Sequence, residues 1–169
     1  CGAVTTAEIA ERVAGRNGLP WSGTYPQDPL LSAVALKQLQ IVLRDDIPGR
    51  AAKLGEGMRG GLDGLKERHE CIGDVRGMGL YQMLDIVTDR DSRTPDPEMA
   101  ERIRYNAMLE GVVLICVKNY IRVCPPLIIT EAQLADVMGR LETAIKRAEG
   151  GFPKNMDISS SSSLATNER

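Results

Sequence analysis

The sequence predicts a small α+β domain in the second half of the chain and an incomplete domain in the first half. From Cys71 onward, short apolar strands alternate with helical segments, whereas residues 1–68 contain helical patterns and almost no strand. The helices of the first half are amphipathic and need an apolar surface to pack against, which we expect this chain not to supply. We therefore expect three parts: an incomplete segment over residues 1–68, an α+β domain over residues 69–149 and a disordered serine-rich tail over residues 150–169.

The first half begins with short elements and a long loop. Residues 2–6 have the pattern of a strand end, and Thr6 can cap a short helix over residues 7–13. Residues 15–29 are rich in glycine and proline, which predicts a loop. A loop of this length within a compact domain is typically functional or disordered.

Two longer helices are expected after this loop. Asp28 and Pro29 form a preferred helix start, with aspartate at the N-cap and proline at the first helical position. Apolar residues then recur with a period of about 3.6 until Pro48 interrupts the pattern. A second helix, over residues 49–68, has an apolar stripe but also many glycines, each of which costs about 1 kcal/mol relative to alanine.

The second half alternates strands and helices. Residues 72–80 read as a strand interrupted by glycines, and residues 81–87 continue as a strand. A polar loop over residues 89–96 precedes a helix over residues 97–110, which Gly111 can terminate. Two further strands and a final helix complete the domain; their ranges are 112–117, 120–123 and 130–148.

The strand over residues 120–123 carries one arginine. Side chains alternate along a strand, so Arg122 points away from Ile121 and Val123. If those two residues face the core, the guanidinium faces a cleft or solvent, and in a cleft it can bind a carboxylate through two parallel hydrogen bonds. The alternative is an arginine at a sheet edge that faces only water. The following prolines, Pro125 and Pro126, end the strand because proline cannot donate to a sheet ladder.

Composition and charge argue against several classes of protein. A net charge of −2 gives no electrostatic basis for binding nucleic acid or an anionic membrane. No apolar run approaches the roughly 20 residues of a membrane span, and no secretory signal pattern opens the chain. The 4 cysteines form no CxxC pair and His69 is the single histidine, so a zinc site built from paired motifs is not expected. Reduced, mostly buried thiols in the cytoplasm are the simpler interpretation.

Four stretches form an ordered set along the chain. They are residues 23–30 (GTYPQDPL), residues 73–80 (GDVRGMGL), the arginine strand with Pro125-Pro126-Leu127, and Thr130-Glu131 at the start of the last helix. In order and spacing, from about residue 2 to residue 148, this set resembles the C-terminal part of the class III, pyridoxal-phosphate-dependent aminotransferases. Within that family, residues 70–77 and Asp28-Pro29 look most like 2,2-dialkylglycine decarboxylase.

The resemblance implies a fold and roles for two residues. The fold is α/β, a partial pyridoxal-phosphate-dependent transferase of fold type I, with the C-terminal edge of the large domain and the small α+β C-terminal domain. Thr24 matches the threonine that hydrogen-bonds the cofactor phosphate in the partner subunit, although a turn threonine is the alternative interpretation. Arg122 matches the arginine that binds the substrate carboxylate.

A metal site is also implied by the decarboxylase branch. There the aspartate that matches Asp28 ligates an alkali cation, together with backbone carbonyl groups at the positions of Thr24 and Pro26, and oxygen ligands suit such a hard cation. Asp28 can instead serve only as a helix cap. Pro26 and Gln27 depart from the small residues that are common in this loop, which leaves the geometry of the cation site open.

The resemblance implies a homodimeric or larger enzyme that transfers an amino group from an amino acid to a 2-oxo acid, with decarboxylation left open. In this family the lysine that forms the Schiff base with the cofactor precedes a segment ending near Gly2, so we expect it upstream of this chain. None of the lysines in this sequence has the required context. We therefore expect an enzyme fragment that is inactive by itself.

Two competing hypotheses remain. The chain could be a stand-alone, truncated and non-catalytic paralogue that acts as a dimerisation or interaction module. It could also be a small α+β binding module whose likeness to the family is accidental.

Overall fold

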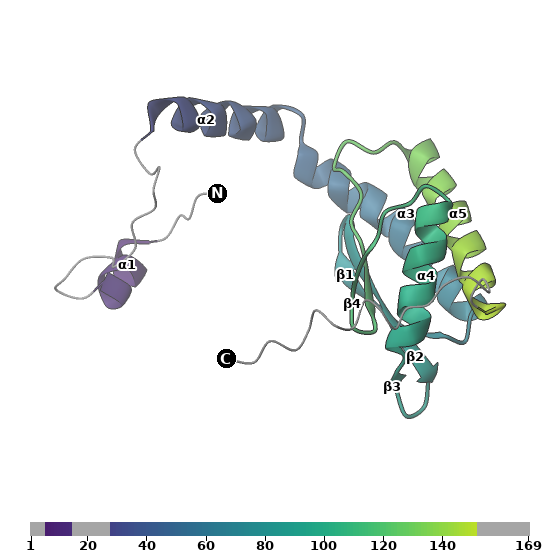
Figure 1. Ribbon diagram of the computed structural model, residues 1–169. Coiled ribbons are helices and arrows are strands. Elements are labelled where there is room, and N and C mark those ends of the chain that lie inside the picture. Colours follow the sequence, from purple (N-terminus) through teal and green to yellow (C-terminus); the bar gives the residue numbers. More distant parts are fainter. Residues whose placement is uncertain (1–5, 15–27, 152–169) are drawn as a thin grey trace. The chain divides into compact units, whose positions relative to one another are not determined.

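The computed structural model describes residues 6–14 and 28–151 (Figure 1). The chain divides into two compact units, residues 1–45 and residues 46–169. The boundary lies before the second long helix, whereas the sequence pattern predicts a single segment over residues 1–68.

The first unit contains helix α1 (Ala7–Ala14) and helix α2 (Pro29–Arg44). The predicted start of α2 is confirmed, because the Asp28 carboxylate accepts a hydrogen bond from the Leu31 N–H at 2.9 Å and Pro29 occupies the first turn. No residue of α2 is buried. Its large apolar side chains are exposed, among them Leu30, Leu31, Val34, Leu36, Leu39 and Leu43.

The second unit is a sheet covered by helices (Figure 1). Its elements are α3 (Ile47–Arg68), β1 (Ile72–Met78), β2 (Tyr81–Asp89), β3 (Thr94–Pro95), α4 (Pro97–Leu109), β4 (Ile115–Val117), β5 (Tyr120–Val123) and α5 (Glu131–Glu149). The strands follow the order β1-β2-β5-β4, with β3 paired to β2, and every pairing is antiparallel. Helices α3 and α4 contact the sheet, and α5 packs against both of them.

The core lies between the sheet and the helices. Helix α3 contributes Leu54, Met58, Leu62 and Leu65, and the strands contribute alternate residues; those with the least exposure include Ile72, Leu84, Ile86 and Ile121. The apolar stripe of α3 therefore packs on the sheet of this same chain. Burial of these side chains is the main source of stability for the second unit.

A tight hairpin joins β1 to β2. Gly77 has φ 140°, and a Cβ atom at this position would lie 2.1 Å from the Tyr81 carbonyl oxygen. Only glycine fits this close approach between two backbones. Gly77 and Gly79 therefore lie in a hairpin, within the stretch of residues 72–80 that the sequence pattern predicts as a strand interrupted by glycines.

Helix α2 ends at Arg44 and α3 begins at Ile47, rather than meeting at Pro48, and two further expected ranges change. The strand predicted over residues 112–117 is regular only from Ile115 to Val117, because the Val112 N–H bonds to the Ala107 carbonyl oxygen at 2.8 Å in the exit from α4. The loop predicted over residues 89–96 contains the two-residue strand β3, which pairs with Val87 and Asp89. No helix in the described part of the chain is long and apolar enough to cross a membrane.

Candidate functional site

The face of the sheet opposite the helices carries charged and aromatic side chains. Ile121 and Val123 are buried, with 0% and 2% of their surface exposed, so the intervening Arg122 lies on this open face as predicted. The register places Arg122 opposite Met83 on one side and Ile115 on the other. The open face is defined here by Asp74, Arg76, Tyr81, Met83, Asp85, Tyr120 and Arg122.

Arg122 is held by a tyrosine from the neighbouring strand. Its Nη1 donates a hydrogen bond to the Tyr81 hydroxyl at 3.1 Å, and its guanidinium carbon lies 5.7 Å from the centre of the Tyr81 ring. The ring face attracts the cation, and the hydrogen bond that Arg122 donates to Tyr81 raises the pKa of Arg122. Among the described residues, no carboxylate lies within ion-pair distance of Arg122.

A second arginine on the open face has a different environment. The Arg76 guanidinium lies 5.5 Å from the centre of the Tyr120 ring, and it forms ion pairs with Asp85 at 3.2 Å and Asp74 at 3.7 Å. Two carboxylates therefore neutralise Arg76 within the chain. Arg122 has only a neutral phenol as its partner in the described part of the chain.

The β4–β5 turn is fixed beside these residues. Asn119 is buried, and its amide nitrogen donates to the Ile86 carbonyl oxygen at 3.1 Å and to the Asp85 carboxylate. Because Asp85 also binds Arg76, a single network connects the turn to strand β1. This network holds β5, and with it Arg122, in register with β2.

An apolar hollow of about 430 Å³ adjoins Tyr81. Met78, Leu80 and Leu127 contribute to its lining, together with the Tyr81 ring and the exposed Cys124. Tyr81 thus borders the hollow while its hydroxyl contacts Arg122. This combination can bind a small molecule that carries both an anionic group and an apolar part.

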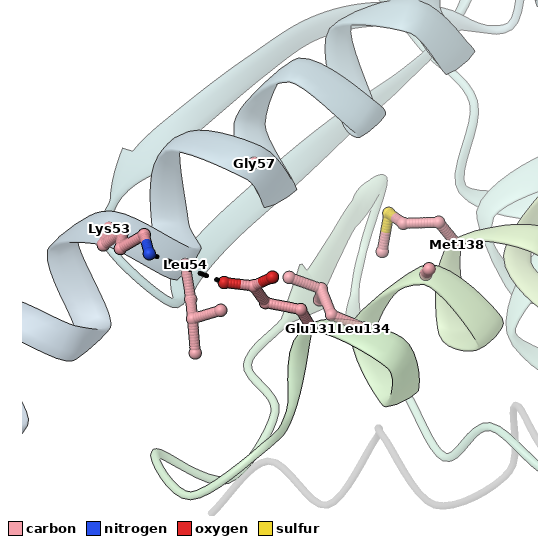
Figure 2. A pocket seen from close by; sticks show the side chains of 7 residues that line it. Lys53, Leu54, Gly57, Glu131, Leu134 and Met138 are labelled. Carbon is pink, nitrogen blue, oxygen red and sulfur yellow. Dashed lines mark ion pairs between the residues drawn. The ribbon is translucent and has the colours of Figure 1, made fainter.

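A second hollow, of about 310 Å³, lies between α3 and α5 (Figure 2). Figure 2 shows the Lys53 ammonium group pointing toward the Glu131 carboxylate, at 3.7 Å, with the apolar side chains of Leu54 and Leu134 near this pair. Both charged groups are largely exposed, so this ion pair contributes little. The hollow shares no residue with the open face.

The other predicted site residues lie mainly outside the described part of the chain. Thr24 and Pro26 fall in residues 15–27, which the structure does not describe, and Asp28 is seen as the cap of α2. The predicted phosphate contact of Thr24 and the predicted alkali-cation site therefore stay predictions. No group of three or more His, Cys, Asp or Glu side chains suited to a metal ion occurs among the described residues.

The described lysines do not match the environment that a pyridoxal cofactor needs. A lysine that bonds to such a cofactor is activated by a desolvated or cationic pocket. Here none of the described lysines is buried, and three of them form ion pairs, namely Lys53, Lys66 and Lys146. None of the described lysines therefore has the environment of a lysine that bonds to this cofactor.

Tyr81 is the residue of this site that the sequence did not indicate. Gln82 pairs with Val123, so Tyr81 is the diagonal neighbour of Arg122 on the same face of the sheet. Recognising this contact requires knowing that β5 pairs with β2, which are separated by β3, α4 and β4 along the chain.

Comparison with known proteins identifies a family. The family model for class-III aminotransferases matches residues 2–145. An alanine/serine racemase of Pyrococcus horikoshii is 36% identical over 126 residues, which cover 73% of this chain and 26% of the racemase. A taurine–pyruvate aminotransferase of Bilophila wadsworthia is 32% identical over 128 residues, which cover 71% of this chain and 28% of that enzyme. The chain spans about a quarter to a third of the length of these relatives.

Solved structures give the same result. An amine transaminase from an uncultivated Pseudomonas species, in its PLP-bound form, has a TM-score of 0.72 and 37% identity, with 77% of this chain and 30% of that chain covered. The omega transaminase of Pseudomonas jessenii in complex with PMP has a TM-score of 0.73 and 26% identity, with 84% and 32% covered. These similarities confirm the predicted fold class, a partial fold type I α/β structure.

Proposed function

The chain belongs to the class III aminotransferase family, and from this premise we propose that it supplies the substrate-carboxylate site of a pyridoxal-phosphate-dependent transaminase. The reaction is the transfer of an amino group from an amino acid to a 2-oxo acid. Pyridoxal phosphate, when bound in the complete enzyme, provides the electron sink for this chemistry. The role of this chain's described residues is to bind and orient the substrate.

One observation carries the proposal: Arg122 is an arginine on the open face whose partner within the described chain is neutral. A guanidinium has five N–H donors in a planar fork that matches a carboxylate. Arg76, on the same face, already binds two aspartates. Arg122 is therefore the arginine of this face that is available to an anionic substrate.

The proposal extends to the cofactor and to assembly. We propose that Thr24 hydrogen-bonds the cofactor phosphate of a partner subunit in a homodimer or larger oligomer, as the family resemblance implies. We further propose that Asp28, Thr24 and Pro26 bind an alkali cation. We also propose a domain boundary at residue 68 of this chain in the complete protein, and a decarboxylation step. Each of these rests on the resemblance.

The role of Arg122 can be tested by Arg122→Gln in the complete enzyme. Loss of charge-assisted hydrogen bonds of about 1.5–3 kcal/mol raises the KM for an amino-acid donor by roughly 10-fold to 100-fold. The KM for an amine donor without an anionic group should stay unchanged. Steady-state kinetics with both donors measure this difference, and an unchanged KM for the amino acid would contradict the proposal.

Arg59→Gln is a matched control. Arg59 lies on α3, where it pairs with Asp63 at 3.0 Å, and its loss should leave both KM values unchanged. The isolated chain belongs in the same assay. We expect it to show no transamination with added pyridoxal phosphate, because none of its described lysines is buried.

A second candidate function is an interaction module without catalytic activity. The exposed apolar side chains of α2 favour it, because such a helix is normally covered by another protein surface. The intact mass of the protein from its native source distinguishes the two functions. A mass near that of this chain supports the interaction module, and a much larger mass that includes upstream peptides supports the enzyme.

A further inference from the structure

The Tyr81 hydroxyl has an unused hydrogen-bond donor. A phenol hydroxyl has one hydrogen to donate and can also accept. Here the oxygen accepts from Arg122 Nη1 at 3.1 Å, so its own hydrogen points elsewhere. In the described part of the chain, this contact with Arg122 is the only hydrogen bond of the hydroxyl group. About half of the Tyr81 surface is exposed, at 49%.

Arg122 contributes further donors beside this hydroxyl. The bond to Tyr81 uses one of its five N–H groups, and among the described residues no other hydrogen-bond acceptor contacts the guanidinium. Stacking on the Tyr81 ring and the hydrogen bond to its hydroxyl favour this arrangement of the arginine side chain. The two side chains therefore present a preorganised group of a cationic fork and a neutral O–H donor.

We propose that the Tyr81 hydroxyl binds the carboxylate of the amino donor directly, together with Arg122; this inference rests on the proposed function. A carboxylate can accept about four hydrogen bonds through its two oxygens, whereas a bidentate contact with Arg122 supplies about two of them. Tyr81 adds a donor without adding charge. It also keeps Arg122 in position when no substrate is bound, because it replaces water at Nη1.

The second arginine–tyrosine pair on the open face gives an internal comparison. Arg76 also stacks on a tyrosine ring, that of Tyr120, but in the described part of the chain no hydrogen bond joins its guanidinium to the Tyr120 hydroxyl. The carboxylates of Asp74 and Asp85 occupy Arg76 instead. The pairing of hydroxyl and unneutralised guanidinium is therefore a property of Tyr81 and Arg122. Tyr120→Phe is the matched control for Tyr81→Phe.

Direct binding can be measured on the full chain with propionate as the probe. Propionate titrations followed by NMR should shift the Arg122 Nε–H and Tyr81 ring signals of the wild type, whereas propylammonium should shift neither. Loss of a hydrogen bond to a charged group weakens binding about tenfold in Tyr81→Phe. Arg122→Gln should abolish binding, and Tyr120→Phe should leave it unchanged. Equal propionate affinity in the wild type and Tyr81→Phe would overturn the inference.

Kinetics of the complete enzyme provide the second readout. Tyr81→Phe should raise the KM for an amino-acid donor about tenfold and leave the KM for an amine donor without an anionic group unchanged. An equal rise for both donors would mean a merely structural role and would overturn the inference. If Arg122→Gln raises the amino-acid KM and Tyr81→Phe does not, the role of Tyr81 fails and the proposed function stands. If neither variant changes either readout, both fail.

Discussion

At the scale of single residues, Cys71 shows how burial controls a reactive group. Its thiol lies at the end of the core, where it donates to Glu149 at 3.7 Å, and Glu149 also bonds to His69 at 3.0 Å. Burial, reinforced by the charge of Glu149, raises the pKa of Cys71 to about 12. Cys71 therefore stays protonated under ordinary conditions and is a poor nucleophile. The exposed Cys124 is accessible to reagents.

This shift predicts a loss of stability in alkali. The folded pKa of Cys71 lies above the unfolded value of 9.0, so the folded chain binds more protons between about pH 9 and about pH 12. The contribution of Cys71 is fully present below pH 9 and falls as the pH rises, by up to about 1.4 kcal/mol per pH unit. Urea unfolding at about pH 8 and about pH 10.5 measures this loss as the difference between the two free energies of unfolding. The loss should be smaller in Cys71→Ala; an equal loss in both proteins would contradict the assignment.

The cysteines also show what a sequence can reveal at this scale. Mostly buried thiols were expected, but of the three described cysteines only Cys71 is buried, while Cys116 is half-buried and Cys124 is exposed. Composition does not predict which thiol is buried and which is exposed. Alternation along β5 does predict that Cys124 is exposed, because the residue after the inward-facing Val123 faces outward. The same alternation placed Arg122 correctly.

At the scale of secondary structure, a glycine in the β1–β2 hairpin and a glycine in helix α3 have different roles. Gly77 lies in the β1–β2 hairpin at φ 140°, beside the Tyr81 backbone, whereas a Cβ atom on Gly57 of α3 would meet nothing within 4 Å. Gly77 is required by the fold. Gly57 only lowers the stability of its helix.

Two alanine substitutions test this difference. Gly77→Ala should lower the free energy of unfolding by about 2–3 kcal/mol, because of backbone strain and the 2.1 Å approach to the Tyr81 carbonyl oxygen. Gly57→Ala should raise it by about 1 kcal/mol, because alanine favours a helix. Denaturant unfolding of the second unit measures both changes. If the two variants shift stability in the same direction, the assigned roles are wrong.

Most elements were predictable from local pattern. The cap at Asp28 and the starts of α4 and α5 are short-range signals, and each is found in the structure. The partner of α3 was not predictable. Its apolar stripe indicates a buried face, but the strands that cover it follow it in sequence, and strand order depends on long-range pairing that periodicity does not reveal.

At the scale of the whole molecule, the described residues form one core, in the second unit, whereas helix α2 has no buried residue and Ile9 and Val13 of α1 are exposed. Leu62 of α3 is fully buried, whereas Leu36, Leu39 and Leu43 of α2 are each more than half exposed. Identical side chains thus have opposite energetic roles in the two helices. The exposed leucines of α2 are the side chains that a second protein surface would cover.

Substitutions in α2 and α3 test this contrast. Replacing Leu36, Leu39 and Leu43 together by glutamine should reduce hydrophobic dye binding and self-association of the chain without changing the unfolding midpoint of the second unit. Leu62→Ala should instead cost about 2–5 kcal/mol. Light scattering, dye fluorescence and urea unfolding measure these effects. A lowered midpoint in the triple variant would show that α2 contributes to the core.

The antiparallel register of β2 and β5 has a consequence for how this protein can change over evolutionary time. Tyr81 and Arg122 share a face only because Gln82 pairs with Val123. One residue inserted within either strand would turn its outward side chains toward the core. Insertions and deletions are therefore disfavoured in these strands, while the exposed residues 91–93 of the β2–β3 turn offer a more tolerant position. Under the proposed role of Tyr81, a point substitution at position 81 changes the anion preference while the fold stays intact.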